Sequence, residues 1–94
     1  MKLILLTIMF YSSLYAIPTS GYIPNKETAI QVAIAILSPI YGVEHIKKNT
    51  PFKAVLKNNI WIVTGSLTKI MPGGVPIIKI NKMTAEIISV SHGK

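Results

Sequence analysis

The longest regular pattern of apolar and polar positions covers residues 28–42, TAIQVAIAILSPIYG. Apolar side chains recur there at spacings of three and four residues, which predicts an α-helix with one stripe turned toward a core. The stripe consists of Ile30, Ala33, Ile34, Leu37 and Ile40 or Tyr41. Val32 and Ile36 widen it, so little of this helix is polar. Either the helix is covered on more than one side or part of its surface awaits a partner.

Local signals mark the two ends of this helix. Asn25 suits the N-cap position, because its side-chain oxygen accepts from the free N–H groups of the first turn. Glu27 places a negative charge near the positive end of the helix dipole. Pro39 predicts a kink or an end near Ser38, and Gly42 is a natural stop.

Strand patterns follow Pro51, after a short polar segment at 43–50 that has room for one further helical turn. Residues 52–57 alternate, and Asn58 and Asn59 predict a tight turn because Asn tolerates positive φ. Residues 60–67 are almost continuously apolar, which is typical of a central strand covered on both faces. The remaining segments are a loop at 68–76, a strand at 77–81 with Val75 as an alternative start, a turn at 82–85, a strand at 86–91 and a chain end at 92–94.

This order of elements predicts the α+β fold class. One long N-terminal helix packs across a curled antiparallel sheet of about four strands, which are joined as hairpins. We expect Trp61 in the core, because a large aromatic residue in a strand of a small domain is usually buried.

Residues 1–16, MKLILLTIMFYSSLYA, have the layout of a secretory signal peptide. Lys2 gives the charged start, an apolar run follows, and small and polar residues lead to Ala16. A retained anchor is the alternative, but a spanning helix needs about 20 apolar residues and this run is shorter. We therefore expect residues 17–94 to form a single domain that is released into the periplasm, with no membrane span after cleavage.

The charge is strongly positive, with ten lysines, no arginine and three glutamates. Cleavage after Ala16 removes only Lys2, which leaves nine lysines and a net charge near +6. Nucleic acid is disfavoured as a partner, because the lysines are scattered and Arg, the main base and phosphate reader, is absent. Solubility, an anionic envelope surface and an acidic protein partner remain as explanations of the charge.

The side chains that usually carry catalysis are scarce. Glu27, Glu44 and Glu86 are the carboxylates, each in a different element, and there is no Asp or Cys. The sequence therefore lacks the residues for a Ser–His–Asp or Cys–His catalytic site, and it has no pair of carboxylates placed for hydrolysis. His45 and His92 have no further ligands near them in sequence, so no metal is expected. Gly73 and Gly74 precede a strand, not a helix, so they predict a hairpin loop and not a phosphate or cofactor site.

Three blocks of the chain resemble a known family. They are YIPNKETAIQVAIAILSPIYG (22–42), PFKAVLKNNIWIVTGSL (51–67) and GGVPIIKINKMTAEIISVSHGK (73–94). Together they resemble bacterial immunity proteins with the nuclear transport factor 2 (NTF2) fold. The resemblance implies a cystatin-like or NTF2-like domain that binds and neutralises a protein toxin. With a signal peptide, the implied target acts in the periplasm, for instance a cell-wall-degrading enzyme.

The inferred mechanism is steric and needs no chemistry of the inhibitor's own. The residues expected to contact the partner are the loop residues Lys69, Ile70, Met71, Pro72, Gly73, Gly74, Val75 and Pro76, together with Lys53 and Lys79 on the solvent side of the sheet. Two other functions stay open at this point. One is an envelope-binding or protease-inhibitor-like accessory domain without a toxin partner, and the other is a small ligand-binding enzyme of the same fold.

Overall fold

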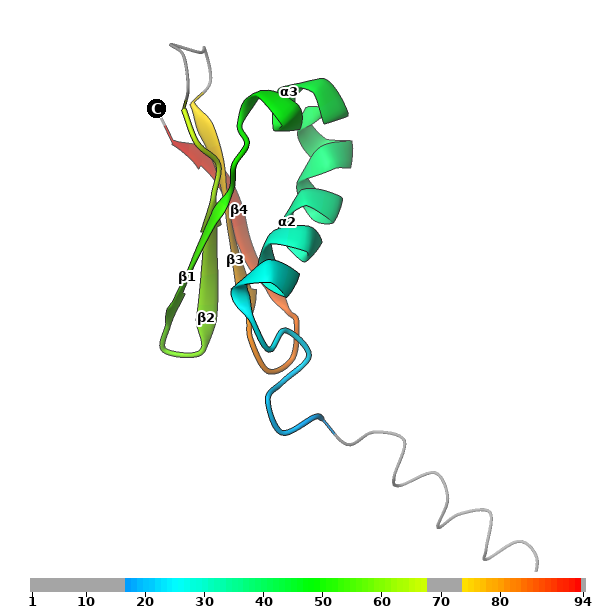
Figure 1. Cartoon of the computed structure of the whole chain (residues 1–94), viewed down its shortest axis with the longest axis vertical. Helices are drawn as coiled ribbons and strands as arrows, with labels where there is room; N and C mark the ends of the chain where they lie inside the picture. Colours follow the sequence, from blue (N-terminus) through cyan, green and yellow to red (C-terminus); the bar gives the residue numbers. More distant parts are fainter. Residues whose placement is uncertain (1–16, 68–73, 94) are drawn as a thin grey trace, which may run out of the picture.

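A computed structural model describes residues 17–67 and 74–93. Two helices precede four strands in the order of the sequence (Figure 1). The elements are α2 (Lys26–Tyr41), α3 (Val43–Lys48), β1 (Lys53–Lys57), β2 (Ile60–Thr64), β3 (Val75–Asn81) and β4 (Ile87–Gly93). The strands form one antiparallel sheet in the order β1-β2-β3-β4, and α2 runs along one face of it. The predicted α+β class is confirmed.

Helix α2 begins where the sequence predicts. The Oδ1 atom of Asn25 accepts hydrogen bonds of 2.9 Å from both the backbone N–H and the hydroxyl of Thr28. Of the two alternatives predicted at Pro39, an end near Ser38 is wrong, because α2 continues to Tyr41 with Pro39 inside it, and a kink stays a prediction. Proline removes a single hydrogen bond, and the Gly42 N–H still closes the last turn on the Ser38 carbonyl at 2.8 Å.

The β1–β2 and β3–β4 turns are built on asparagine. Asn58 and Asn59 have φ angles of 51° and 61° between β1 and β2, which confirms the predicted tight turn. Between β3 and β4, the Oδ1 atom of Asn81 accepts from the N–H groups of Met83 at 2.8 Å and Thr84 at 3.1 Å. These side-chain bonds hold a turn that lacks the usual glycine.

Two strand boundaries differ from the prediction. β2 ends at Thr64 and not at Leu67, because the N–H of Ser66 turns to the carbonyl of Asn49 at 2.7 Å and the chain leaves the sheet. β4 continues to Gly93, so the predicted end of this strand at Ser91 is wrong, because His92 still pairs with Pro76 of β3.

The core lies between α2 and the sheet face toward it. Its buried members are Ile23, Ala29, Ala33, Leu37, Ile46, Phe52, Trp61, Val63, Ile78 and Ile80. Trp61 is 6% exposed, which confirms its place in the core. The predicted stripe faces the core, since Ala33 and Leu37 are buried and Ile30, Ile34 and Tyr41 pack against them. Ile40, the alternative to Tyr41, is 54% exposed. Ala29, which the stripe did not include, is buried as well.

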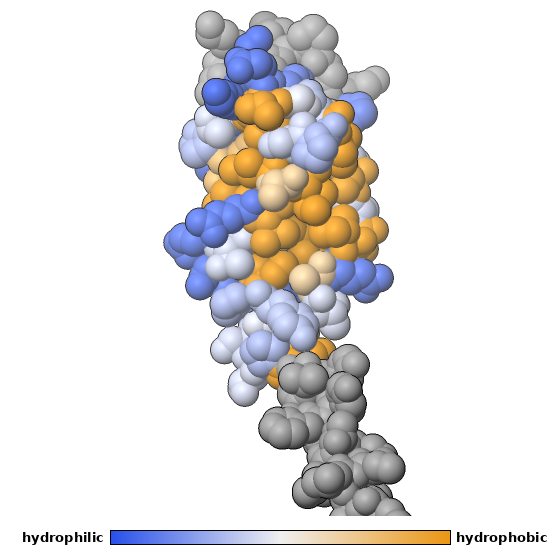
Figure 2. Space-filling view, turned by 90° about the vertical axis from the view of Figure 1, so that its right-hand side faces the viewer, coloured by the Kyte–Doolittle hydropathy of each residue, from blue (hydrophilic) through white to orange (hydrophobic). Residues whose placement is uncertain are grey.

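Much of the remaining surface is apolar. Figure 2 shows apolar residues gathered on the side where α2 lies, with hydrophilic residues toward the margins. β2 is a central strand, as predicted. The prediction that both of its faces are covered is wrong for the described part of the chain, because Ile60 and Ile62 remain partly exposed. None of the helices within residues 17–67 and 74–93 is long and apolar enough to cross a bilayer.

Candidate partner-binding surface

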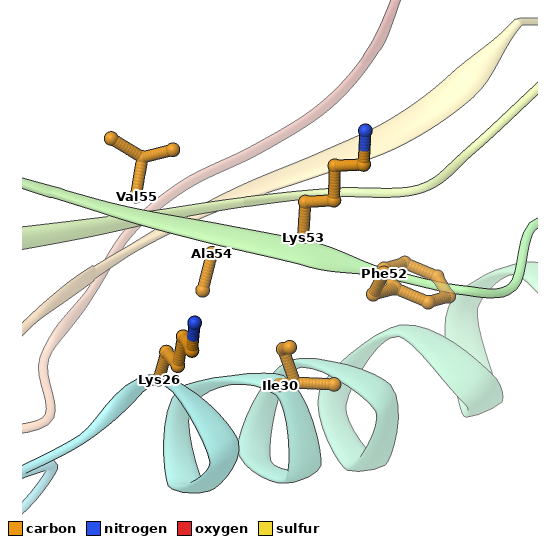
Figure 3. A pocket seen from close by; sticks show the side chains of 6 residues that line it. All are labelled: Lys26, Ile30, Phe52, Lys53, Ala54 and Val55. Atoms are coloured by element: carbon orange, nitrogen blue, oxygen red, sulfur yellow. The ribbon is translucent and has the colours of Figure 1, made fainter.

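The sheet face opposite α2 carries most of the strand lysines. Side chains alternate along a strand, so Lys53, Val55 and Lys57 point away from the helix while Ala54 points toward it. Figure 3 shows this alternation for Lys53, Ala54 and Val55. Strand pairing places further residues on this outer sheet face, which consists of Lys53, Val55, Lys57, Ile60, Ile62, Thr64, Ile77 and Lys79.

An apolar centre with lysines around it characterises the outer sheet face. Ile62 lies between Val55 and Lys79 in the register of the sheet, and Val55 is 61% exposed. Lys53, Lys57 and Lys79 are all exposed. A partly apolar centre with a charged rim is the usual composition of a protein-binding surface.

No carboxylate balances these lysines within the sheet. Glu27 and Glu44 lie in helices, and Glu86 precedes β4. The ion pair found among the described residues joins Lys47 to Glu44 at 3.9 Å on the surface of α3, with both side chains mostly exposed. The outer sheet face is therefore a patch of uncompensated positive charge, which favours an acidic partner.

A shallow cleft of about 360 Å³ lies where α2 meets β1. Its walls are Lys26, Ile30, Phe52, Lys53, Ala54 and Val55. Ile30 and Ala54 face each other across it, and the amino group of Lys26 points from α2 toward β1 (Figure 3). The cleft offers the ammonium group of Lys26 and apolar walls, but no acid, base or nucleophile for a reaction. It can hold an acidic or apolar side chain of a partner at the edge of the outer sheet face.

The structure locates half of the residues that the sequence predicted for partner binding. Lys53 and Lys79 lie on the outer sheet face, and Val75 is half-exposed at the start of β3. Gly74 and Pro76 are buried, so they offer little surface of their own. Lys69, Ile70, Met71, Pro72 and Gly73 lie outside the described residues, and their contact with a partner stays a prediction.

One cluster of rings was not predicted. The Tyr41 hydroxyl lies 3.4 Å from Nδ1 of His92, and the Tyr41 ring stacks on His45 with centroids 6.1 Å apart. His45 and His92 are separated by 46 residues in the sequence. Both lie beside Tyr41 because β4, which carries His92, pairs with β3. Within residues 17–67 and 74–93, no group of three or more His, Cys, Asp or Glu side chains gathers as a metal site would require.

Comparison with known proteins assigns the family. The model of a family described as NTF2 fold immunity protein matches residues 28–94. The chain belongs to this family. The match covers nearly all of α2, all of α3 and the four strands, so it supports the arrangement seen in Figure 1. The resemblance expected from the three sequence blocks is thereby confirmed.

A curated relative extends the comparison. The chain is similar to the uncharacterized protein YhhH of Escherichia coli strain K12, with 29% identity over 73 residues. The aligned part is 77% of this chain but only 58% of YhhH, so the chain spans less than two thirds of that relative. No solved structure matches the chain.

Proposed function

We propose that this chain is exported to the periplasm, where it binds a cognate protein toxin through the outer sheet face and blocks it sterically. The observation that carries the proposal is the family match over residues 28–94. The geometry supports it, because the described residues present a lysine-bearing surface and a cleft without catalytic groups. A cell-wall-degrading enzyme is the kind of toxin that acts in this compartment.

Electrostatics and area both favour this surface. Oppositely charged patches accelerate encounter between proteins, and attraction to an acidic toxin cleft would be strongest at Lys53, Lys57 and Lys79. A standard interface takes about 800 Å² from each partner. The outer sheet face, extended by the adjacent cleft, is the broad surface of this small domain on which such an area is available.

The binding site is tested with paired charge reversals. The chain is co-expressed with the toxin encoded beside it, and growth and the dissociation constant of the purified complex are measured. The variant Lys53→Glu/Lys79→Glu is expected to bind at least about tenfold more weakly, since tenfold corresponds to only 1.4 kcal/mol, and to protect poorly. The control Lys47→Glu/Lys48→Glu on α3 changes the net charge equally and should protect like the wild type.

The outcomes separate the parts of the proposal. A wild-type chain that leaves the toxin fully active contradicts the immunity function. Equal binding by both variants contradicts the assignment of the outer sheet face. Salt-sensitive binding to anionic lipid or cell wall, without binding to the toxin, would instead favour the envelope-accessory function.

Export is tested separately. A chain lacking residues 1–16 is expected to remain in the cytoplasm and to give no protection against a periplasmic toxin. Fusion of residues 17–94 to an unrelated cleaved signal peptide should restore protection. Full protection by the shortened chain, or an unprocessed wild-type chain in the cytosolic fraction, would contradict periplasmic action.

A further inference from the structure

The two edges of the sheet differ in chemistry. β1, at one edge, begins with Lys53 and ends with Lys57. β4, at the other edge, is seven residues long, reads IISVSHG and carries neither Lys, Glu nor Pro. Natural edge strands are commonly protected by lysine or proline against pairing with another chain. β1 has this protection. β4 has neither residue type, and its irregularity is a bulge at Ile88, between the pairs Ile80–Ile87 and Lys79–Ser89.

The apolar side chains of β4 are also poorly covered. The backbone of α2 lies close to β1, β2 and β3 but not to β4 in the part of the chain that the structure describes. Ile87 is 37% exposed and Ile88 is 44% exposed, while Val90 is half-buried. β4 therefore combines a free edge with apolar side chains that water still reaches.

Helix α2 adds apolar surface beside this edge. Ile30 lines the cleft at β1, so one flank of the helix points toward that strand. Val32 and Ile36 lie on the opposite flank of the helical wheel, toward the β4 side, and both remain half-buried. This flank belongs to the helix side of the molecule, where Figure 2 shows apolar residues gathered.

We propose that β4 pairs antiparallel with β4 of a second copy, so that two sheets join into one continuous sheet of eight strands. A two-fold axis perpendicular to the sheet at Val90, the middle of β4, generates this pairing. It sets Val90 opposite its own copy, Ser89 opposite Ser91, and Ile88 opposite His92. Both α2 helices then lie on the same face, and Ile88 and Val90 of both copies form an apolar floor between the flanks that carry Val32 and Ile36.

Charge identifies a second copy as the occupant of this edge. The chain carries a formal net charge of +7, so two copies repel each other wherever lysines meet. β4 has no formal charge, so identical strands can pair there without placing like charges opposite each other. An acidic partner would instead be drawn to the outer sheet face.

The distances in the joined sheet agree with this choice. Neighbouring strands lie about 4.8 Å apart, so the two copies of Lys79 on β3 would be separated by three strand spacings, about 14 Å. That exceeds the Debye length of about 8 Å at physiological ionic strength. The repulsion between these lysines is therefore largely screened, and both outer sheet faces stay open on the side opposite the helices.

Sedimentation of the purified chain 17–94, without toxin, tests the dimer. The wild type is expected to show a concentration-dependent monomer–dimer equilibrium. Ile88→Lys places a charge in the apolar floor between the two copies and should weaken dimerisation at least about tenfold, because an ammonium group buried there without a partner is costly. Val55→Lys is the matched control, an equally charged change at an exposed apolar residue of the other edge strand, and should leave the equilibrium unchanged.

Cross-linking tests the register, because the chain has no native cysteine. A mixture of Ser89→Cys and Ser91→Cys chains should form a mixed disulfide faster than either variant forms one with itself, since these positions lie opposite each other in the proposed pairing. A wild type that is monomeric at 100 µM, or dimers that dissociate on Val55→Lys and not on Ile88→Lys, would overturn the proposal. So would a mixture without preferential mixed disulfide. None of these results bears on toxin binding.

Discussion

Trp61 connects the segment before α2 to the middle of the sheet. Its ring lies in the core, and its indole Nε1 donates a hydrogen bond of 2.9 Å to the backbone carbonyl of Ile23. Ile23 is itself 1% exposed, so this carbonyl has little access to water. Trp61 thus supplies both apolar contact and the partner of a buried polar group, and the second role makes it hard to replace.

Replacing the indole tests this double role. Trp61→Phe keeps an aromatic ring but leaves the Ile23 carbonyl without its donor, so we expect the free energy of unfolding to fall by about 1–3 kcal/mol. Urea denaturation followed by circular dichroism measures the change, since the variant loses the single tryptophan fluorophore. Tyr22→Phe, at a neighbouring residue that is 50% exposed, is the control and should change little. Equal midpoints for the two variants would contradict the structural role of the hydrogen bond.

At the level of elements, the local signals were the ones that the sequence predicted well. The N-cap at Asn25, the stop at Gly42 and the turn at Asn58 and Asn59 each depend on a few adjacent residues, and the structure confirms them. Strand alternation likewise sufficed to put Lys53 and Lys79 on the outer sheet face. The same alternation cannot say what covers a face.

The errors arose where distant segments decide the outcome. Cover for both faces of β2 was expected from apolar character alone, but burial depends on where α2 lies, and α2 covers one face of the sheet. Tyr41 and His92 are 51 positions apart in sequence, and they meet because β4 pairs with β3. Such contacts have no signature in a single sequence.

The β1–β2 turn yields a prediction at this scale. Asn59 has a φ of 61°, a left-handed conformation that costs most residues about 1–2 kcal/mol. Asn59→Val should therefore lower the free energy of unfolding by about that amount, because a β-branched side chain tolerates positive φ poorly. Asn59→Gly should be neutral or stabilising, since Asn-Gly is the preferred sequence for this turn. Chemical denaturation of both variants measures the difference, and a valine variant as stable as the glycine variant would be inconsistent with the observed turn.

For the molecule as a whole, stability depends on few contacts. The chain has no cysteine, so no disulfide supports its small core, and domains of this size are marginally stable. The segment ahead of α2 is part of that core although the family match begins at residue 28. The N–H groups of Tyr22 and Ile23 donate to the carbonyls of Met83 and Lys82 at 3.2 and 3.1 Å. Gly21 permits this approach, because a Cβ atom there would lie 2.5 Å from the Lys82 oxygen.

Two truncated chains test whether residues 17–25 contribute to the stability of the fold. A chain of residues 17–94 retains every buried member of the described core, from Ile23 to Ile80, so it should fold with the circular dichroism spectrum of the full chain. A chain of residues 26–94 retains α2 but loses the Ile23 side chain and the acceptor of the Trp61 indole. Burial of an isoleucine contributes about 1.5–3 kcal/mol and an unpaired buried donor costs about 1–3 kcal/mol, so we expect the free energy of unfolding to fall by about 2.5–6 kcal/mol. Thermal and urea unfolding of the two chains measure this difference. If both unfold at the same midpoint, the core is complete without residues 17–25, and the pairing of this segment with the β3–β4 turn contributes nothing to stability.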